Sequence, residues 1–208
     1  MKDLVFKIDS SNSIFKLLNT RIDHRLDIIN LLVETMRFME FAKIIPRPVV
    51  NSISLRTDKR SRLYYFLEKK YFSFAFPFFY ENKKPLNFYY HEAKIDSQLL
   101  SGLKEWYNSS KNDSITTNLD ISCIEAITPD RKGEFLTLLN RLINFEIGYV
   151  RYDDDITGFV SANNPEFHPQ FHLDFFYSNE TTIKIGGKFN EESFRNFLDC
   201  KEFYKVVT

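Results

Sequence analysis

Ile147-Gly-Tyr-Val-Arg-Tyr-Asp-Asp-Asp155 is the first of three short runs that decide the fold of this chain. The second is His168-Pro-Gln-Phe-His-Leu-Asp-Phe-Phe-Tyr177, and the third is Thr181-Thr-Ile-Lys-Ile-Gly-Gly187. Short β-prone runs with turn residues between them are typical of an antiparallel meander. Most of the unusual polar residues of the chain fall within this meander, so it is the first place to look for a functional site.

Alternation along the three runs predicts which side chains share a face, because residues i and i+2 of a strand point to the same side. The apolar positions, such as Tyr152 and Leu173, are expected to face one core. The opposite face is then expected to display Arg151, Asp153, His172, Asp174 and Lys184. The structural alternative is an ordinary solvated sheet face, which carries charged residues without any function.

Two kinds of chemistry fit these residues. Pro169 separates His168 from His172, so the pair is not the helical His-x-x-x-His of a zinc protease. With Asp174 and the acidic run 153–155, the two histidines could instead form a site for a divalent metal ion, because imidazole and carboxylate suit transition metals.

The metal-free hypothesis assigns the acid–base role to His172. Arg151 and Lys184 would then stabilise the charge of a phosphoryl group, as a small ribonuclease requires. Both hypotheses stay open on the sequence alone, and so does the question of whether the chain is an enzyme.

A second candidate surface lies in the first half of the chain, where aromatic and β-branched runs at 49–55, 63–67, 71–76 and 86–91 are expected to form one antiparallel sheet. The segment from Lys43 to Phe72 contains eight basic residues and two acidic ones. Basic residues interleaved with aromatic rings can hold the phosphates and bases of nucleic acid. The predicted contacts are Arg56, Lys59, Arg60, Arg62, Lys69 and Lys70. A charged hairpin turn at 58–60 is the structural alternative.

Helices are expected at both ends and in the middle of the chain. Apolar residues spaced by three and four predict a helix from Ser11 to about Ile45, with an interruption at 19–23. Further helices are expected after Asp96, after Thr128-Pro129 and after Asn190, and each of these residues is a favourable helix start. The polar segment 108–113 is expected to be a loop, and 115–127 to contain a strand. The predicted class is α+β.

Length and composition set the outer limits. At 208 residues, with 43% hydrophobic and 27% charged residues, the chain fits a single globular domain 1–208, with a subdivision into 1–107 and 114–208 as an alternative. The 28 basic residues balance 28 acidic ones, so no global charge draws the chain to nucleic acid or membrane. Cys123 and Cys200 lie far apart and outside any Cys-x-x-Cys pattern, and no segment resembles a signal peptide or a membrane span. A cytoplasmic protein without a membrane partner is expected.

The order Arg151-Tyr-Asp153, a loop, His168-Pro-x-x-His172-Leu and a C-terminal helix rich in Phe and Tyr resembles an uncharacterised bacterial family, domain of unknown function 2290. The resemblance covers mainly the last third of the chain and implies no activity. The family pattern continues with a further histidine, where this chain has Asp174. A shorter similarity, Tyr-x-Asp followed by His-Pro and a second His, is to toxins of bacterial toxin–antitoxin pairs, which implies chemistry on RNA or nucleotides.

Two functional hypotheses follow. The first is a bacterial protein of a defence or toxin-type system that cleaves or modifies nucleic acid through the His/Asp/Arg face. The second is a non-catalytic module that holds nucleic acid or a protein from the same operon on its basic, aromatic N-terminal sheet. A divalent metal ion is the candidate cofactor.

Overall fold

The computed structural model describes residues 3–57, 61–112, 124–162, 168–176 and 182–199. The chain forms two compact units, each assembled from segments that are distant in the sequence. The first unit contains Met1–Ile8, Ile44–Phe76 and Ile147–Thr208, and the second contains Asp9–Lys43 and Pro77–Glu146. These units differ from the predicted subdivision at 1–107 and 114–208, because each of them takes segments from both halves.

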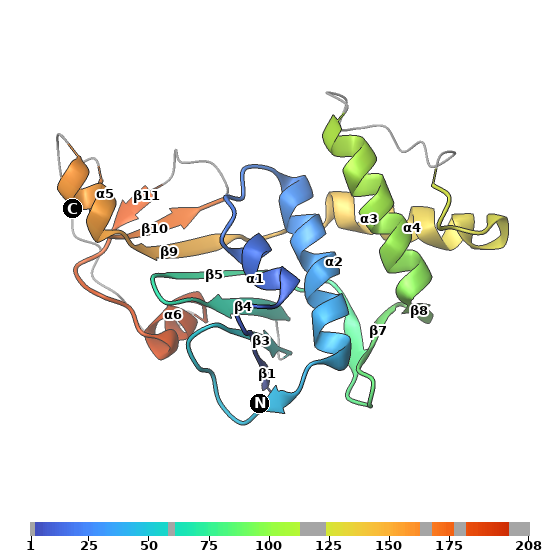
Figure 1. Cartoon of the computed structure of the whole chain (residues 1–208), viewed down its shortest axis with the longest axis horizontal. Helices are drawn as coiled ribbons and strands as arrows, with labels where there is room; N and C mark the ends of the chain where they lie inside the picture. Colours follow the sequence, from blue (N-terminus) through green and yellow to red (C-terminus); the bar gives the residue numbers. More distant parts are fainter. Residues whose placement is uncertain (1–2, 58–60, 113–123, 163–167, 177–181, 200–208) are drawn as a thin grey trace. The chain divides into compact units, whose positions relative to one another are not determined.

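The first unit is built on an eight-stranded antiparallel sheet with the order β11-β10-β9-β5-β4-β3-β1-β2. The pairing of β5 with β9 joins the predicted meander to the aromatic strands of the first half (Figure 1). The strands are β1 (Asp3–Lys7), β2 (Ile44–Ile45), β3 (Ser52–Arg56), β4 (Arg62–Phe66), β5 (Lys70–Ala75), β9 (Val150–Asp154), β10 (Phe171–Phe175) and β11 (Thr182–Lys184). Two helices accompany them, α5 (Ile156–Ser161) and α6 (Glu191–Leu198).

One face of this sheet packs against α6. Its core consists of Tyr64, Phe66, Val150, Tyr152, Leu173, Ile185, Phe189 and Phe194. The Asn190 side chain caps α6 by accepting a hydrogen bond from the Ser193 amide at 2.8 Å, as predicted. The apolar side of the meander therefore lies where the alternation placed it, and its polar side lies on the other face.

The second unit combines helices with a separate three-stranded antiparallel sheet of order β6-β7-β8. Helix α2 packs on α1 and α3, and α3 packs on α4 and β8. Gly102 of α3 allows a close approach, because a Cβ there would lie 2.6 Å from the Ile127 side chain. The elements are α1 (Ser13–Leu18), α2 (Arg25–Phe41), β6 (Phe79–Glu81), β7 (Asn87–Tyr90), β8 (Ala93–Ile95), α3 (Ser97–Asn112), the 3-10 turn η1 (Pro129–Arg131) and α4 (Lys132–Asn144).

The α+β class is confirmed, and so are most helix positions. The first helical segment is interrupted between Leu18 and Arg25, as predicted. The Asp96 side chain accepts hydrogen bonds from the Gln98 and Leu99 amides and so caps α3.

Three predictions about elements were wrong. The run 86–91 does not join the other aromatic strands, because β7 pairs with β6 and β8 in the second sheet. The polar segment 108–112 continues α3 instead of forming a loop. Residues 124–127 contain no strand, and the rest of the predicted strand 115–127 lies outside the described residues, as do Cys123 and Cys200. None of the described helices is long and apolar enough to cross a membrane.

Candidate functional site

The polar face of the meander forms two rows that run across four adjacent strands of the first unit. In one row Lys70 lies opposite Asp153, Asp153 opposite His172, and His172 opposite Lys184. The neighbouring row contains the residue two positions away on each of the same four strands. Its members, in order across the strands, are Phe72, Arg151, Asp174 and Thr182. Directly opposed side chains in a sheet are about 5 Å apart, so this register brings the predicted residues together.

Arg151 is the cation that joins the two carboxylates. Its Nε donates to Asp153 Oδ2 at 2.5 Å, and its Nη2 donates to Asp174 Oδ2. Thr182 Oγ1 donates to the other oxygen of Asp174, Oδ1, at 2.5 Å. Both carboxylates are therefore held with their Oδ2 atoms turned toward the same point.

His172 completes this cluster from the strand β10. Its Nδ1 lies 2.8 Å from the Pro169 carbonyl oxygen, which can only accept, so Nδ1 carries the proton. The other nitrogen, Nε2, lies 3.6 Å from Asp153 Oδ2 and 3.9 Å from Asp174 Oδ2. The imidazole is thus oriented by the backbone, and its second nitrogen faces two carboxylates.

Burial distinguishes this cluster from an ordinary solvated sheet face. His172 is 5% exposed and Asp174 is 4% exposed, whereas solvated charged residues leave most of their side chain in water. Arg151 and Asp153 are partly open, with 21% and 17% of their side chains exposed. The cluster is therefore reached from solvent on the side of these two residues.

Burial also shifts the ionisation of the charged groups. Desolvation raises the pKa of Asp153 above its ordinary value, although Arg151 and His172 oppose this shift. Desolvation lowers the pKa of Lys70, and Asp153 opposes that shift. Burial disfavours the charge of Arg151 as well, but Asp153, Tyr149 and Asp174 together outweigh it and raise the pKa of Arg151. The guanidinium is thus a permanent charge of the site, whereas Asp153 takes up a proton more readily than an exposed aspartate does.

His168 forms a separate pair with Asp155 beside the cluster. Its Nε2 lies 2.9 Å from Asp155 Oδ2, and its ring centre lies 5.5 Å from that of His172. The Gly158 amide donates to Asp155 Oδ1, and this bond, with the His168 bond, lowers the pKa of Asp155. A side chain at position 158 would block the pair, because a Cβ there would lie 2.2 Å from His168 Nε2. Because the His168 side chain is 42% exposed, this second imidazole is open to solvent.

The acidic run 153–155 does not act as one unit. Asp154 points to the opposite face of the strand, where it accepts from Gln170 Nε2 at 3.0 Å and pairs with Lys188 at 2.9 Å. Lys184 is exposed beside His172 in the register of β10 and β11. Of the six predicted catalytic residues, Arg151, Asp153, His172 and Asp174 converge, while His168 and Lys184 lie at the edge of their cluster.

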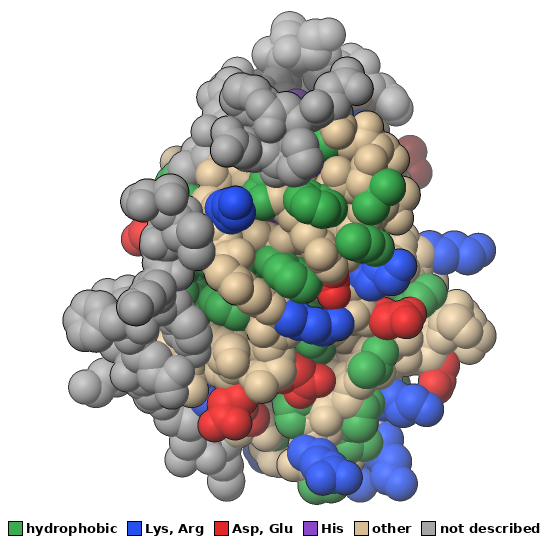
Figure 2. All heavy atoms as spheres, turned by 90° about the vertical axis from the view of Figure 1, so that its left-hand side faces the viewer, with side chains coloured by type: hydrophobic (Ala, Val, Ile, Leu, Met, Phe, Trp, Pro, Cys, Tyr) green, Lys and Arg blue, Asp and Glu red, His purple; other side chains and the backbone are tan. Residues whose placement is uncertain are grey.

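The basic residues predicted to contact nucleic acid are dispersed. Arg56 is buried and bonded to Asp3 and Asp199, and Arg62 donates to Ser73 Oγ and the Gly148 carbonyl oxygen. Lys69 is exposed, Lys70 belongs to the row described above, and Lys59 and Arg60 lie outside the described residues. Figure 2 shows positive, negative and hydrophobic side chains interspersed on the face that it draws.

Two partners of the cluster were not predicted from the sequence. The Pro169 carbonyl and the Thr182 hydroxyl orient His172 and Asp174. Asp155, which belongs to the predicted acidic run, orients His168. Thr182 lies two residues before Lys184, so strand alternation predicts that both side chains are on the polar face. The hydrogen bond from Thr182 to Asp174 could not be predicted, because it depends on the register of β10 with β11.

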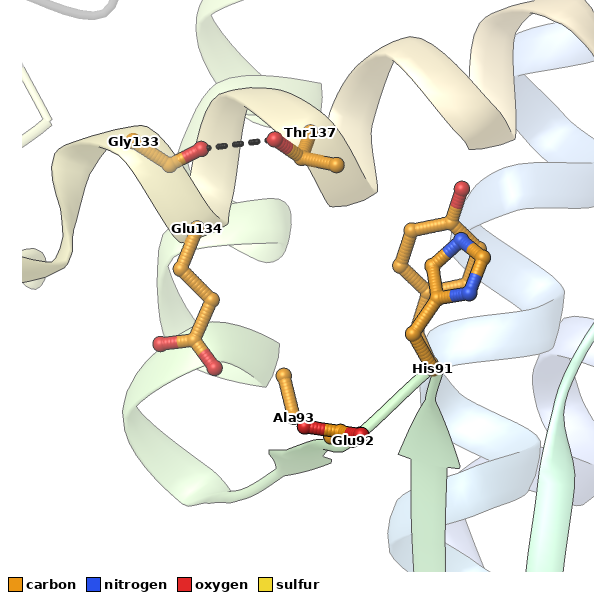
Figure 3. A pocket seen from close by; sticks show the side chains of 7 residues that line it. His91, Glu92, Ala93, Gly133, Glu134 and Thr137 are labelled. Carbon is orange, nitrogen blue, oxygen red and sulfur yellow. Dashed lines mark hydrogen bonds between the residues drawn. The ribbon is translucent and has the colours of Figure 1, made fainter.

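A cavity of about 530 Å³ lies in the second unit, between the β7–β8 turn and the start of α4 (Figure 3). It contains none of the predicted site residues. Its polar groups are partly engaged already, since Thr137 Oγ1 donates to the Gly133 carbonyl oxygen and Glu134 accepts from Arg131. The cavity therefore offers few convergent groups for chemistry, unlike the cluster on the sheet.

No protein-family model, curated protein or solved structure matches this chain. The resemblance to the uncharacterised bacterial family and to toxins therefore stays a prediction.

Proposed function

We propose that this chain cleaves or modifies nucleic acid through Arg151, Asp153, His172 and Asp174, in the defence or toxin-type role that the sequence resemblance implies. The observation that supports it is the orientation of His172, whose Nε2 faces both carboxylates while Nδ1 donates to a backbone carbonyl. An imidazole that is held in one tautomer beside acidic groups is suited to act as a general acid or base.

The surrounding cations suit a phosphate ester. Lys70 and Lys184 stand at the two ends of the row that contains Asp153 and His172, and Arg151 lies in the next row. Fixed positive charges stabilise the additional negative charge that develops on phosphate oxygens during transfer. His168, paired with Asp155, supplies a second, more accessible imidazole for proton transfer.

The rival function is a non-catalytic interaction module, and one observation favours a protein partner for it. Phe79 is 70% exposed on β6, which is an edge strand of the second sheet. Edge strands with exposed apolar residues are ready to pair with another chain. The basic part of this hypothesis has less support, because Arg56 and Arg62 are committed to internal bonds.

Cleavage of end-labelled single-stranded RNA and DNA by the purified protein tests the proposal. We expect His172→Ala to slow cleavage by at least about 10²-fold, the lower range for loss of a general acid or base. His91→Asn is the matched control, since His91 lies in the second unit at φ 51°, a backbone conformation that asparagine tolerates. Circular dichroism verifies that both variants fold.

Cleavage by His172→Ala at the wild-type rate, or no cleavage of either substrate by the wild type, would overturn the proposal. The rival function predicts another pattern. Partner capture should then survive His172→Ala and fail in Phe79→Asp.

A further inference from the structure

We infer that Asp153, His172 and Asp174 bind one divalent transition-metal ion through Asp153 Oδ2, His172 Nε2 and Asp174 Oδ2. Ligand atoms of these three residues all lie within 4.8 Å of one another. The inference rests on the proposed function for its purpose, since the ion would serve that centre. With Nε2 of His172 bound to the ion, proton transfer would pass to His168, which lies beside the cluster. The test of the inference requires no nucleic acid.

The unused nitrogen of His172 is the observation that points to an ion. With the proton on Nδ1, the neutral ring directs the lone pair of Nε2 at two carboxylate oxygens. His172 is 5% exposed, so most of the ring is shielded from solvent. Arg151 supplies one positive charge to the two carboxylates, so a metal ion beside Nε2 would offset the remaining negative charge and use this lone pair.

A proton on Nε2 fits the distances less well than a metal ion does. A protonated imidazole would be drawn to about 2.7–2.9 Å from a carboxylate oxygen, whereas the observed distances are 3.6 and 3.9 Å. Metal–ligand bonds of about 2.1 Å in tetrahedral geometry place two ligand atoms about 3.4 Å apart. The two distances from His172 Nε2 would have to shorten by only a few tenths of an ångström to reach this spacing.

Each ligand also has the supporting bond that metal ligands usually receive. The Pro169 carbonyl accepts from His172 Nδ1, and Thr182 donates to Asp174. Arg151 donates to both Oδ2 atoms. Because a carboxylate oxygen has two lone pairs, each Oδ2 can accept a hydrogen bond from Arg151 and bind an ion at the same time. Partners of this kind fix the orientation of ligating groups and raise metal affinity.

The ligand set selects the class of ion. One imidazole and two carboxylates suit Zn²⁺, Mn²⁺ or Fe²⁺, whereas Ca²⁺ prefers six to eight oxygen ligands. Three protein ligands leave at least one coordination position for water or a phosphate oxygen. The partly exposed side chains of Asp153 and Arg151 mark the side from which such a ligand would enter.

Calorimetric titration of the chelator-treated, full-length protein with Zn²⁺ and with Mn²⁺ tests the inference. We expect one ion of at least one of these metals per chain and no comparable binding of Ca²⁺. His172→Ala and Asp174→Asn should each weaken binding by at least about 100-fold, and Thr182→Val, which removes only a supporting bond at an exposed position, by about 10-fold. Asp154→Asn should bind as the wild type does, because Asp154 lies on the opposite face.

Absence of one-to-one binding of both metals, or binding that His172→Ala and Asp174→Asn leave unchanged, would overturn the inference. If the two variants do not fold, unchanged affinity in Thr182→Val would overturn the inference in their place. Cleavage by a protein that binds neither metal would refute the metal site and leave the proposed function standing, whereas metal binding without cleavage would refute only the function.

Discussion

Replacing Arg151 with methionine is expected to lower the free energy of unfolding by about 3–5 kcal/mol at pH 7, the usual result of removing one partner of a buried ion pair. Methionine preserves much of the side-chain length but leaves Asp153 and Asp174 without their shared cation. The two carboxylates have 17% and 6% of their side chains exposed, so water replaces the lost bonds poorly.

The loss of unfolding free energy caused by Arg151→Met should be smaller at low pH. Burial already raises the folded-state pKa of Asp153 above its unfolded value of about 3.9. A group with a raised folded pKa stabilises the fold below the unfolded pKa, and this contribution disappears as the pH rises through the folded pKa. Asp153 in the variant can therefore take up a proton near pH 4 and avoid an unpaired charge.

Urea unfolding followed by circular dichroism at pH 7 and near pH 4 measures both effects. Arg141→Met is the control, because Arg141 is exposed on α4 and its replacement should change stability by no more than about 0.5 kcal/mol. A loss below about 1 kcal/mol for Arg151→Met would show that Arg151 does not hold the cluster together. Equal losses at the two pH values would show that protonation of Asp153 does not relieve its unpaired charge.

Phe194→Ala should destabilise the first unit by about 3–5 kcal/mol, the range for truncating a buried phenylalanine. Phe194 is the fully buried anchor of α6, and its ring packs against Tyr64 and Tyr71 with ring centres 6.5 and 6.0 Å apart. Removing the ring leaves a cavity between α6 and the sheet.

The matched control is Phe41→Ala, because Phe41 is 80% exposed and its truncation removes little packing. Urea unfolding should show a change of about 0.5 kcal/mol or less for this variant. If Phe194→Ala were as stable as Phe41→Ala, α6 would not be anchored on the sheet by this residue.

The faces of the meander were predictable because the side-chain period of a strand is fixed at two residues. Alternation alone placed Tyr152 and Leu173 in the core and Arg151 and Asp174 on the other face, and the structure confirms this division. Helix starts at Asp96 and Asn190 were also predictable, since a side-chain cap is a local interaction.

Pairings between distant segments were not predictable. β5 joins β9 across more than seventy residues, and the N-terminal strand β1 lies between β2 and β3, although neither contact has a local signature. The polar segment 108–112 continues α3 despite its weak helix propensity, because helical turns before it extend into it. The pair of His168 with Asp155 depends on loop geometry at Gly158, which strand alternation does not describe.

We propose that one face of β9 and β10 is a chemical centre. Asp153 and Asp154 test this proposal directly, because they are neighbours on one strand and point to opposite faces. The measurement is the rate at which Asp153→Asn and Asp154→Asn cleave the RNA or DNA strand that the wild type cleaves. We predict a rate within about threefold of the wild type for Asp154→Asn and a loss of at least about 10²-fold for Asp153→Asn. Equal rates for the two variants would contradict the claim.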